Sequence, residues 1–363
     1  MSIRIPCSAP GLHEEAAAVR GAIDRVLNSG WFILGPEVEA FESEFAAAAG
    51  ARHAIGVGNG TDALALILRA LDIGPGDEVI TSPLSAAFSA LAIRMVGAQP
   101  VFADIDQERH TVSPTAVEAA ITPRTRALMP VHLYGQSADM ASLSAIADRH
   151  KLPIVEDCAQ AHLATSAGRP VGTIGIAGAF SFYPTKNLGA VGDGGAVVTN
   201  DAALAARVAR LRNGGQRRKY DHEEAGVNSR LDELQAAVLR VRLQHLPAWT
   251  SRRRALAATY RQGLRSASLH VPVEFDPGHV YHLFVIRSRQ RDQLQQHLRT
   301  RGIETLVHYP VALPDQPALS AGAVACPQAR VACAEVLSLP IYPALTDHEL
   351  ADVCGAVSDF QKG

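Results

Sequence analysis

Short apolar runs alternate with segments of helical periodicity between about residues 55 and 200, and this alternation constrains the fold more than any other feature of the chain. The expected strands are 78–81, 100–103, 127–133, 153–155, 180–183 and 196–199, and helices are expected near 86–96, 114–121 and 139–149. Strands that are separated by helices of this length can be joined by parallel crossovers. The pattern therefore predicts an α/β fold, a sheet with helices on its faces.

Two longer helical patterns lie at either end of this region. Asn59 or Thr61 could cap a helix whose apolar residues follow i, i+3, i+4, i+7 spacing from Leu64 to Leu71. After Asp201, a long amphipathic helix is expected from Leu231 towards Trp249. The basic run 252–254 is expected on the solvated face of the helix that follows.

A second, smaller α/β unit is expected near the C-terminus. It begins near His279 and contains a predicted strand at 283–286 and a predicted helix around 290–301. With 363 residues and 47% hydrophobic content, the chain can bury a large core and divide into two domains. We expect a large domain over 1–248 and a small C-terminal domain over 249–363.

Composition narrows the partners and the compartment. The net charge of −2 gives no positive excess for nucleic acid or an anionic membrane, and no run of about 18 apolar residues predicts a membrane span. The five cysteines are scattered without a C-x-x-C pair, so neither a disulfide framework nor a zinc site is expected. The N-terminus lacks the apolar region of a signal peptide. These features favour a cytoplasmic protein without a metal.

Lys186 stands between a short apolar segment and a glycine-dense loop that contains Gly189, Gly192, Gly194 and Gly195. An amine becomes a useful nucleophile when desolvation lowers its pKa, and glycines allow the backbone to approach a bulky bound ring. Lys186 is therefore a candidate for a lysine that forms a Schiff base. The alternative is an ordinary surface lysine in a flexible loop, which is the commoner state of lysines.

Asp157 closes the apolar run that starts at Leu152, which predicts its carboxylate at the carboxyl end of a parallel strand, where ligands of open α/β sheets bind. A carboxylate there can pair with a protonated pyridine nitrogen. The alternative is a helix N-cap. Gln160 and His162 follow, and Gln160 could donate a hydrogen bond to a phenolate oxygen of a bound ring.

The run Gly58-Asn59-Gly60-Thr61 precedes a predicted helix, and helix N-termini offer free N–H groups to a phosphate. The chain has no G-x-G-x-x-G, Walker A, G-x-S-x-G or H-E-x-x-H sequence, so dinucleotide, nucleotide triphosphate, serine hydrolase and zinc protease sites lack support. A phosphate-binding helix start, a strand-end aspartate and a loop lysine in this order describe a pyridoxal phosphate site.

The motifs along the chain resemble those of the DegT/DnrJ/StrS family of sugar aminotransferases over nearly its full length. The segments that carry the resemblance are 29–31 with 35–36, 59–62, 74–80, 97–102, 130–135, 156–162, 178–195, 228–236 and 308–310. The resemblance implies the fold-type-I architecture of pyridoxal phosphate enzymes. In that architecture a large domain holds a mostly parallel seven-stranded sheet flanked by helices, and a smaller α/β domain follows.

The resemblance also assigns roles to residues. Lys186 would form the Schiff base with pyridoxal phosphate and move the proton, and Asp157 would pair with the ring nitrogen. The cofactor contacts expected in this way are Gly60, Thr61 and Ser181 at the phosphate and Gln160 at the ring oxygen. Asn228 would reach the phosphate of a neighbouring subunit, which implies a homodimer with shared active sites.

One position departs from the family pattern. Members usually have an aromatic residue that stacks on the pyridine face shortly after the strand of Ile80 and Thr81, whereas the aligned residue here is Ala86. Phe88 is expected to supply the ring from two residues later, because a shift of two residues keeps one face of a strand, though not of a helix.

The activity implied by the resemblance is amino transfer from an amino acid, with L-glutamate expected, to a nucleotide-linked keto-deoxysugar, through pyridoxamine phosphate. The segments 220–249 and 305–310 look most like those of members that act on dTDP-3-keto-6-deoxyhexoses and give 3-amino sugars. Three alternatives stay open. They are a C4 aminotransferase on a 4-keto sugar, a dehydratase, and a regulator that binds the cofactor or the sugar nucleotide without turnover. Dehydratases of the family carry histidine in place of Lys186.

Substrate contacts are predicted from the same resemblance. The candidates are Trp31, His308, Tyr309 and a basic group among Arg217, Arg218 and Lys219, with Lys219 preferred.

Overall fold

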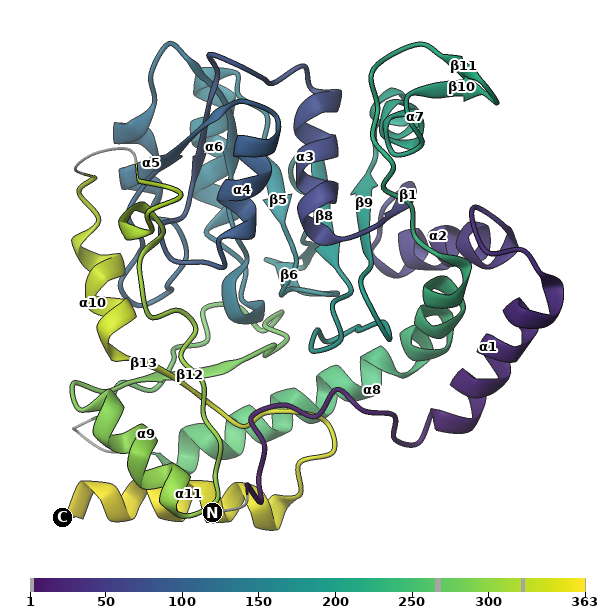
Figure 1. The fold of residues 1–363 in the computed structure, drawn as a ribbon. Helices are drawn as coiled ribbons and strands as arrows, with labels where there is room; N and C mark the ends of the chain where they lie inside the picture. Colours follow the sequence, from purple (N-terminus) through teal and green to yellow (C-terminus); the bar gives the residue numbers. More distant parts are fainter. Residues whose placement is uncertain (1–2, 265–268, 321–323, 363) are drawn as a thin grey trace.

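The computed structural model describes residues 3–264, 269–320 and 324–362, and it places one large sheet at the centre of the upper part of the molecule (Figure 1). The strands are β1 (His53–Val57), β2 (Glu78–Thr81), β3 (Gln99–Phe102), β4 (Thr125–Met129), β5 (Val155–Asp157), β8 (Ala177–Ser181) and β9 (Gly195–Thr199). They form two ladders, β1-β9-β8-β5 and β3-β2-β4. Parallel bridges from Leu128 to Ile154 and from Val131 to Asp157 join β4 to β5.

The resulting sheet is mostly parallel. Strand β5 runs parallel to β8, and β2 runs parallel to both β3 and β4. Only β9 runs against its two neighbours, β1 and β8. This order confirms the predicted mostly parallel seven-stranded sheet, and the carboxyl ends of β5 and β8 meet at one edge.

Helices cover both faces of this sheet because successive strand residues point to opposite sides. The large-domain helices are α1 (Ala16–Ser29), α2 (Pro36–Ala48), α3 (Gly60–Ala70), α4 (Phe88–Met95), α5 (Pro114–Ala120), α6 (Met140–His150) and α7 (Ala202–Leu211). Val79 packs in the core beneath α3, α4 and α7, whereas its neighbour Ile80 packs with α5 and α6. A third cluster joins α2 to β8 and β9 through Phe41, Phe45 and Phe180.

Three of the predicted strands have ends that are shifted by two residues or more. One of them is β8, which spans Ala177–Ser181 rather than 180–183. The run 127–133 leaves the sheet after Met129, and Leu133–Gly135 forms the short helix η1, in which Tyr134 has φ 60°. Strand β5 starts at Val155 and ends at Asp157 rather than spanning 153–155. These changes leave Asp157 at the carboxyl end of its strand, as the sequence predicted.

Helix α8 (Glu233–Gly263) corrects the prediction of two separate helices in this region. It is a single helix of 31 residues that continues through Pro247, and at 1.5 Å per residue it spans about 46 Å. Its buried residues Leu246, Thr250, Arg253, Leu256 and Tyr260 follow helical spacing. Arg253 is therefore buried, and the prediction that the whole run 252–254 is solvated was wrong.

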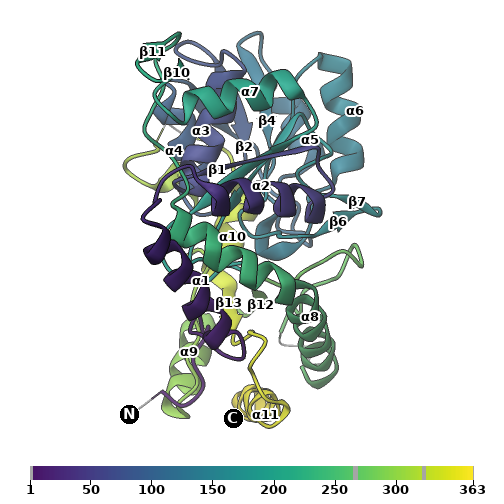
Figure 2. The same cartoon turned by 90° about the vertical axis from the view of Figure 1, so that its right-hand side faces the viewer.

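The C-terminal part lies around the second half of α8, below the sheet in Figures 1 and 2. Strands β12 (Phe284–Arg287) and β13 (Val336–Leu339) pair antiparallel, and α9 (Arg291–Thr300), α10 (Pro327–Glu335) and α11 (Asp347–Lys362) pack around them. The first half of α8 packs in the upper core and the second half in the lower one. A division at residue 248 falls inside this helix and stays a prediction.

Short elements complete the chain. They are β6 (Thr165–Ser166), β7 (Arg169–Pro170), β10 (Gln216–Arg218), β11 (Asp221–His222) and η2 (Leu313–Asp315). Among the helices in the described ranges, none is both long and apolar enough to cross a bilayer.

Candidate functional site

The start of α3 lies against the end of β8. Asn59 caps the helix, because its side-chain oxygen accepts the N–H of Asp62 at 2.9 Å. The N–H groups of Gly60 and Thr61 lie in the first turn of α3, where backbone N–H groups have no acceptor within the helix. A Cβ atom on Gly60 would lie only 2.8 Å from Cβ of Ser181. The fold thus brings together three residues that were predicted to hold a phosphate.

The glycine that opens β9 makes this close approach possible. A Cβ atom on Gly195 would lie 2.4 Å from the carbonyl carbon of Asn59 and 2.8 Å from the nitrogen of Gly60. Any side chain at position 195 would push α3 away from the sheet. The cradle formed by Gly60, Thr61 and Ser181, which we call the phosphate cradle, therefore depends on two glycines.

Ser229 ties the segment that contains Asn228 to the helix start. Its hydroxyl donates to Asp62 at 2.7 Å and accepts the N–H of Gly58 at 3.0 Å. Asn228 is exposed and forms an isolated bridge with Asn213. Its predicted action on a second subunit stays a prediction.

Asp157 is buried at the carboxyl end of β5. One carboxylate oxygen accepts the hydroxyl of Ser89 at 2.7 Å, and the other accepts the N–H of Ala159 at 3.0 Å. The second bond resembles the N-cap that was the alternative for this residue. Ser89 was missed by the sequence analysis, because its contact with Asp157 spans 68 residues and no local pattern announces it.

Lys186 lies in the loop between β8 and β9 and is partly buried. Its backbone N–H donates to the carbonyl of Tyr183 at 2.9 Å, which closes a turn in the loop. Burial lowers the pKa of Lys186 from its ordinary value to about 8, although the carboxylate of Asp157 opposes this shift. A substantial fraction of the amine is therefore neutral near pH 8.

Two buried histidines, His162 and His282, and the partly buried His308 lie near this lysine. Their pKa values fall because of burial first and the lysine charge second. Burial lowers the pKa of His162 to about 3 and that of His308 to about 4, and it holds the pKa of His282 well below its ordinary value. All three are therefore neutral at pH 7. Neither ring nitrogen of His162 has a hydrogen-bond partner among the described residues.

Gln160 joins the large domain to the segment 308–309. Its amide oxygen accepts the N–H of Tyr134 at 2.7 Å, and its amide nitrogen donates to the hydroxyl of Tyr309 at 3.0 Å. The hydroxyl of Tyr134 donates to the carbonyl of His308. The substrate candidates His308 and Tyr309 thus lie beside the cofactor candidate Gln160.

Phe88 does not occupy an extended segment. Ala87 has φ −60° and ψ −16°, and Phe88 is the first residue of α4. The argument that Phe88 lies on the same face of a strand as Ala86 was therefore wrong, because Phe88 begins a helix. Phe88 is exposed and directly precedes Ser89, which contacts Asp157. Its stacking role stays a prediction.

Trp31 and Lys219 have contacts only with their own surroundings among the described residues. The indole N–H of Trp31 donates to the carbonyl of Ile33 at 2.8 Å. The ammonium of Lys219 lies 5.2 Å from the ring centroid of Tyr220, at the exposed hairpin of β10 and β11 that projects from the body in Figure 1. The structure does not bring these two residues to Lys186.

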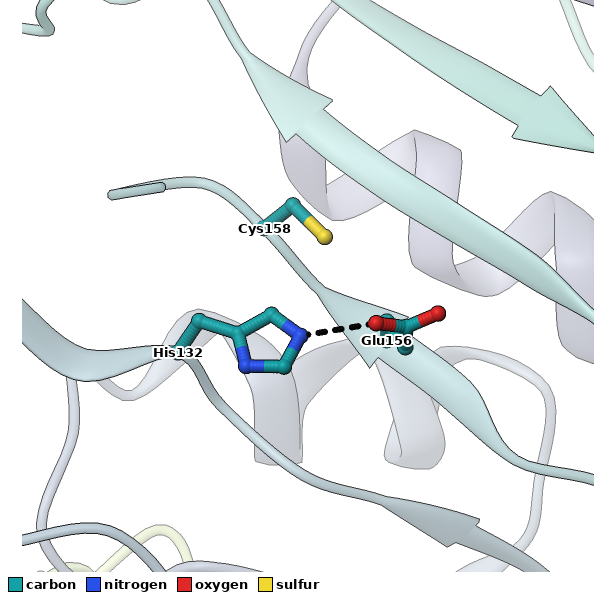
Figure 3. Close-up of side chains that lie close together, drawn as sticks. All are labelled: His132, Glu156 and Cys158. Carbon is teal, nitrogen blue, oxygen red and sulfur yellow. Dashed lines mark hydrogen bonds and ion pairs between the residues drawn. The ribbon is translucent and has the colours of Figure 1, made fainter. Parts of the chain in front are cut away.

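A buried group of His132, Glu156 and Cys158 has the composition of a metal site (Figure 3). Nδ1 of His132 accepts the N–H of Ala138 at 3.0 Å, so its Nε2 carries the proton and donates to Glu156 at 2.9 Å. Glu156 also accepts three backbone N–H groups, from Gly172, Ile174 and Gly175. The ring nitrogens of His132 and the carboxylate of Glu156 thus already have hydrogen-bond partners within the protein. The group therefore supports the structure beside Asp157.

The lowered pKa of Lys186 predicts a specific pH dependence. Imine formation between the chain and a small aldehyde needs the neutral amine, so its rate at Lys186 should rise with pH and level off above about 8. An unperturbed lysine would still gain rate beyond about pH 10. Stopped-flow absorbance measures the rate, with Lys186→Met as the background. A rate that still rises steeply at pH 9.5 contradicts the shift.

Comparison with known proteins identifies the family of the chain. The model of the DegT/DnrJ/EryC1/StrS aminotransferase family matches residues 13–358. The chain is 52% identical to dTDP-3-amino-3,4,6-trideoxy-alpha-D-glucose transaminase of Streptomyces venezuelae over 354 residues, which are 96% of this chain and 93% of that protein. It is 51% identical to the erythromycin biosynthesis sensory transduction protein EryC1 of Saccharopolyspora erythraea, over 91% of this chain and 93% of that protein.

A solved structure has the same fold. The crystal structure of S. venezuelae DesV in complex with a ketimine intermediate superposes with a TM-score of 0.97 at 50% identity, and the match covers 100% of both chains.

Proposed function

Because the chain belongs to the DegT/DnrJ/EryC1/StrS aminotransferase family, we propose that it moves an amino group from an amino acid to a ketone of a nucleotide-linked deoxysugar with pyridoxal phosphate. L-glutamate is the proposed donor, and a dTDP-3-keto-6-deoxyhexose is the proposed acceptor. The product is the 3-amino sugar. The reducing cytoplasm is the proposed compartment, in keeping with five free cysteines.

One observation supports this proposal most strongly: three parts of a pyridoxal phosphate site come from distant segments to one edge of the sheet. Gly60 and Ser181 are close enough that a Cβ on Gly60 would lie within 2.8 Å of Cβ of Ser181, and the charge of Asp157 acts on Lys186. The N-terminus of α3 favours a phosphate dianion. The residues present therefore fit the cofactor.

The bound cofactor would supply an aldehyde that accepts the amino group and later passes it on, and a ring that withdraws electrons. The chain supplies position and proton transfer. The phosphate cradle would fix the phosphate, Asp157 would keep a proton on the ring nitrogen, and Gln160 would donate to the ring oxygen. Lys186, with its pKa near 8, can take and return a proton near neutral pH.

Two further roles are proposed from the family resemblance. The chain would form a homodimer with shared active sites, in which Asn228 acts on the phosphate bound by a second copy. His308 and Tyr309 would contact the sugar nucleotide, because Gln160 holds the hydroxyl of Tyr309 at 3.0 Å. Trp31 and Lys219 stay proposed substrate contacts that depend on the second copy for a place near the site.

The C3 position of the acceptor is supported by what the S. venezuelae relative is named for, a transaminase of dTDP-3-amino-3,4,6-trideoxy-alpha-D-glucose. Single-turnover kinetics tests it. The protein in its pyridoxamine phosphate form is mixed separately with dTDP-3-keto- and dTDP-4-keto-6-deoxyglucose while the visible band of the aldehyde form is recorded. Return of the band with the 3-keto sugar alone supports the proposal. Return of the band with the 4-keto sugar alone would show that the amino group is transferred to C4.

The name of the S. erythraea relative favours a second candidate, a regulator that binds the cofactor without turnover. The visible spectrum separates the two functions. An aminotransferase loses the band of the aldehyde form when L-glutamate is added, whereas a regulator keeps it. The lowered pKa of Lys186 favours the enzyme, because an amine that is partly neutral near pH 8 can take and return a proton.

Gly60→Ala should weaken the hold on the phosphate. The new Cβ would lie 2.8 Å from Cβ of Ser181 and push the helix start away from the strand end. We expect affinity for pyridoxal phosphate to fall by about tenfold, the effect of one strained or lost hydrogen bond. Affinity for pyridoxal, which has no phosphate, should change much less. Equilibrium absorbance titration measures both.

Gly21→Ala is the matched control for this change, because a Cβ on Gly21 of α1 meets nothing within 4 Å. Equal losses for pyridoxal and its phosphate would show that Gly60 does not act through the phosphate.

A further inference from the structure

Four arginines in the described part of the chain are almost completely buried: Arg212, Arg242, Arg253 and Arg287. Three of them have a carboxylate partner. Arg212 pairs with Glu42, Arg242 pairs with Glu15 at 3.1 Å, and Arg287 pairs with Glu335 at 2.8 Å. Arg253, only 6% exposed, has no carboxylate partner among the described residues. Because an uncompensated buried charge is costly, this exception calls for an anion from outside the chain.

Backbone carbonyls fix the position of Arg253 without neutralising it. Its Nη1 donates to the carbonyls of Tyr281, His282 and Ile341 at 3.1, 3.3 and 2.9 Å. Its Nε is buried and has no partner among the described residues. Burial lowers the pKa of Arg253 to about 10, so the guanidinium stays charged at neutral pH. One edge of the guanidinium is thus held, and another donor has no acceptor.

The same arginine lines a cavity of about 260 Å³ together with Lys186. The walls come from the N-terminal segment 8–15, the lysine loop, α8 and residues 342–344. Both acidic residues in these walls are engaged: Glu15 binds Arg242, and Glu14 accepts the indole N–H of Trp249 at 2.9 Å. The cavity therefore has unsatisfied positive charge from Arg253, and Lys186 forms part of its wall.

The size of the cavity favours a small anion. Sites for drug-sized ligands begin at about 300 Å³. A cavity of about 260 Å³ suits an amino acid better than a nucleotide-linked sugar with its base, ribose, diphosphate and hexose. A carboxylate can accept two N–H groups of a guanidinium at once.

We propose that Arg253 binds a carboxylate of the amino-acid donor, in the cavity that it shares with Lys186. This inference rests on the proposed amino transfer and adds the residue that recognises the donor. The carboxylate of the donor supplies the negative charge that Arg253 lacks among its described neighbours. A sugar-nucleotide diphosphate is the other anion of the reaction, and the two half-reactions separate these sources.

The experiment compares the two half-reactions of the cofactor-loaded enzyme in wild type, Arg253→Met, Arg253→Lys and Arg254→Met. Loss of the visible band with L-glutamate follows the donor half-reaction. Its return when the amine form meets the keto sugar follows the acceptor half-reaction. We expect Arg253→Met to lower the second-order rate constant for glutamate by about 100-fold, as expected for a lost charge-assisted pair, and to change the acceptor half-reaction less than about fivefold.

Arg254→Met is the matched control. Arg254 donates to the carbonyl of His279 at 2.9 Å and does not line the cavity, so both half-reactions should stay near wild type. Arg253→Lys keeps the charge and should recover part of the glutamate rate. It also keeps the test valid if Arg253→Met does not fold.

Calorimetric binding of glutarate, a dicarboxylate without an amine, provides a readout apart from activity. Binding should weaken in Arg253→Met and persist in Arg254→Met. Equal losses in both half-reactions, a loss confined to the acceptor half-reaction, or unchanged glutarate binding would each overturn the proposal. If the wild type binds glutarate through Arg253 but shows no half-reaction, the proposed function fails while the anion site stands.

Discussion

Lys186→Arg is expected to lower amino transfer by at least about four orders of magnitude, the upper range for loss of a catalytic acid–base group. Arginine keeps the positive charge and much of the length, but its guanidinium does not lose a proton near neutral pH. It can therefore neither attack an aldehyde nor carry the proton. The donor half-reaction, followed by the visible band of the cofactor in single turnover, measures the loss.

Lys151→Arg makes the same chemical change at a distant lysine that ends α6 in left-handed conformation. Its turnover should match that of the wild type. Reduction with borohydride in the presence of the cofactor should label Lys186 in the wild type and leave the Lys186→Arg variant unlabelled. If Lys186→Arg retains more than about one hundredth of the activity, Lys186 is not the group that moves the proton.

Asp157→Asn should lower turnover by about 100- to 1,000-fold, because a neutral amide cannot hold a proton on the ring nitrogen. The change also removes one of the two acceptors that bind Ser89 and the N–H of Ala159. The Asp157 carboxylate raises the pKa of Lys186, so its loss should lower that pKa below about 8. The rise in the rate of imine formation with pH should then occur at lower pH than in the wild type.

Asp201→Asn is the matched control for this substitution, since Asp201 caps α7 by accepting the N–H groups of Ala203 and Leu204. Asparagine caps helices as well as aspartate does, so activity should not change. If Asp157→Asn is as mild as Asp201→Asn, then Asp157 acts only as a cap. A pH profile that moves upwards instead would show that its charge does not act on Lys186.

The sequence by itself determined the parts of this protein that depend on local physics. Short continuous apolar runs predicted the strands around Val79 and Val197, because these strands are buried on both faces of the sheet. The sequence narrowed the helix cap to Asn59 or Thr61, because a cap acts within three residues, and the structure shows that Asn59 is the cap. The order of a helix start, a strand-end aspartate and a glycine-flanked lysine identified Gly60, Asp157 and Lys186 as site candidates.

Only the tertiary structure decided which side chains meet across long stretches of chain. Ser89 contacts Asp157, and Gln160 contacts Tyr309, through bonds that span 68 and 149 residues. Arg253 lies in a basic run that looks solvated, yet packing of α8 buries it at the cavity that Lys186 also lines, without a carboxylate partner in the ranges that the structure describes. Burial, pairing and lowered pKa values depend on what surrounds a group in space, and sequence neighbours do not specify that environment.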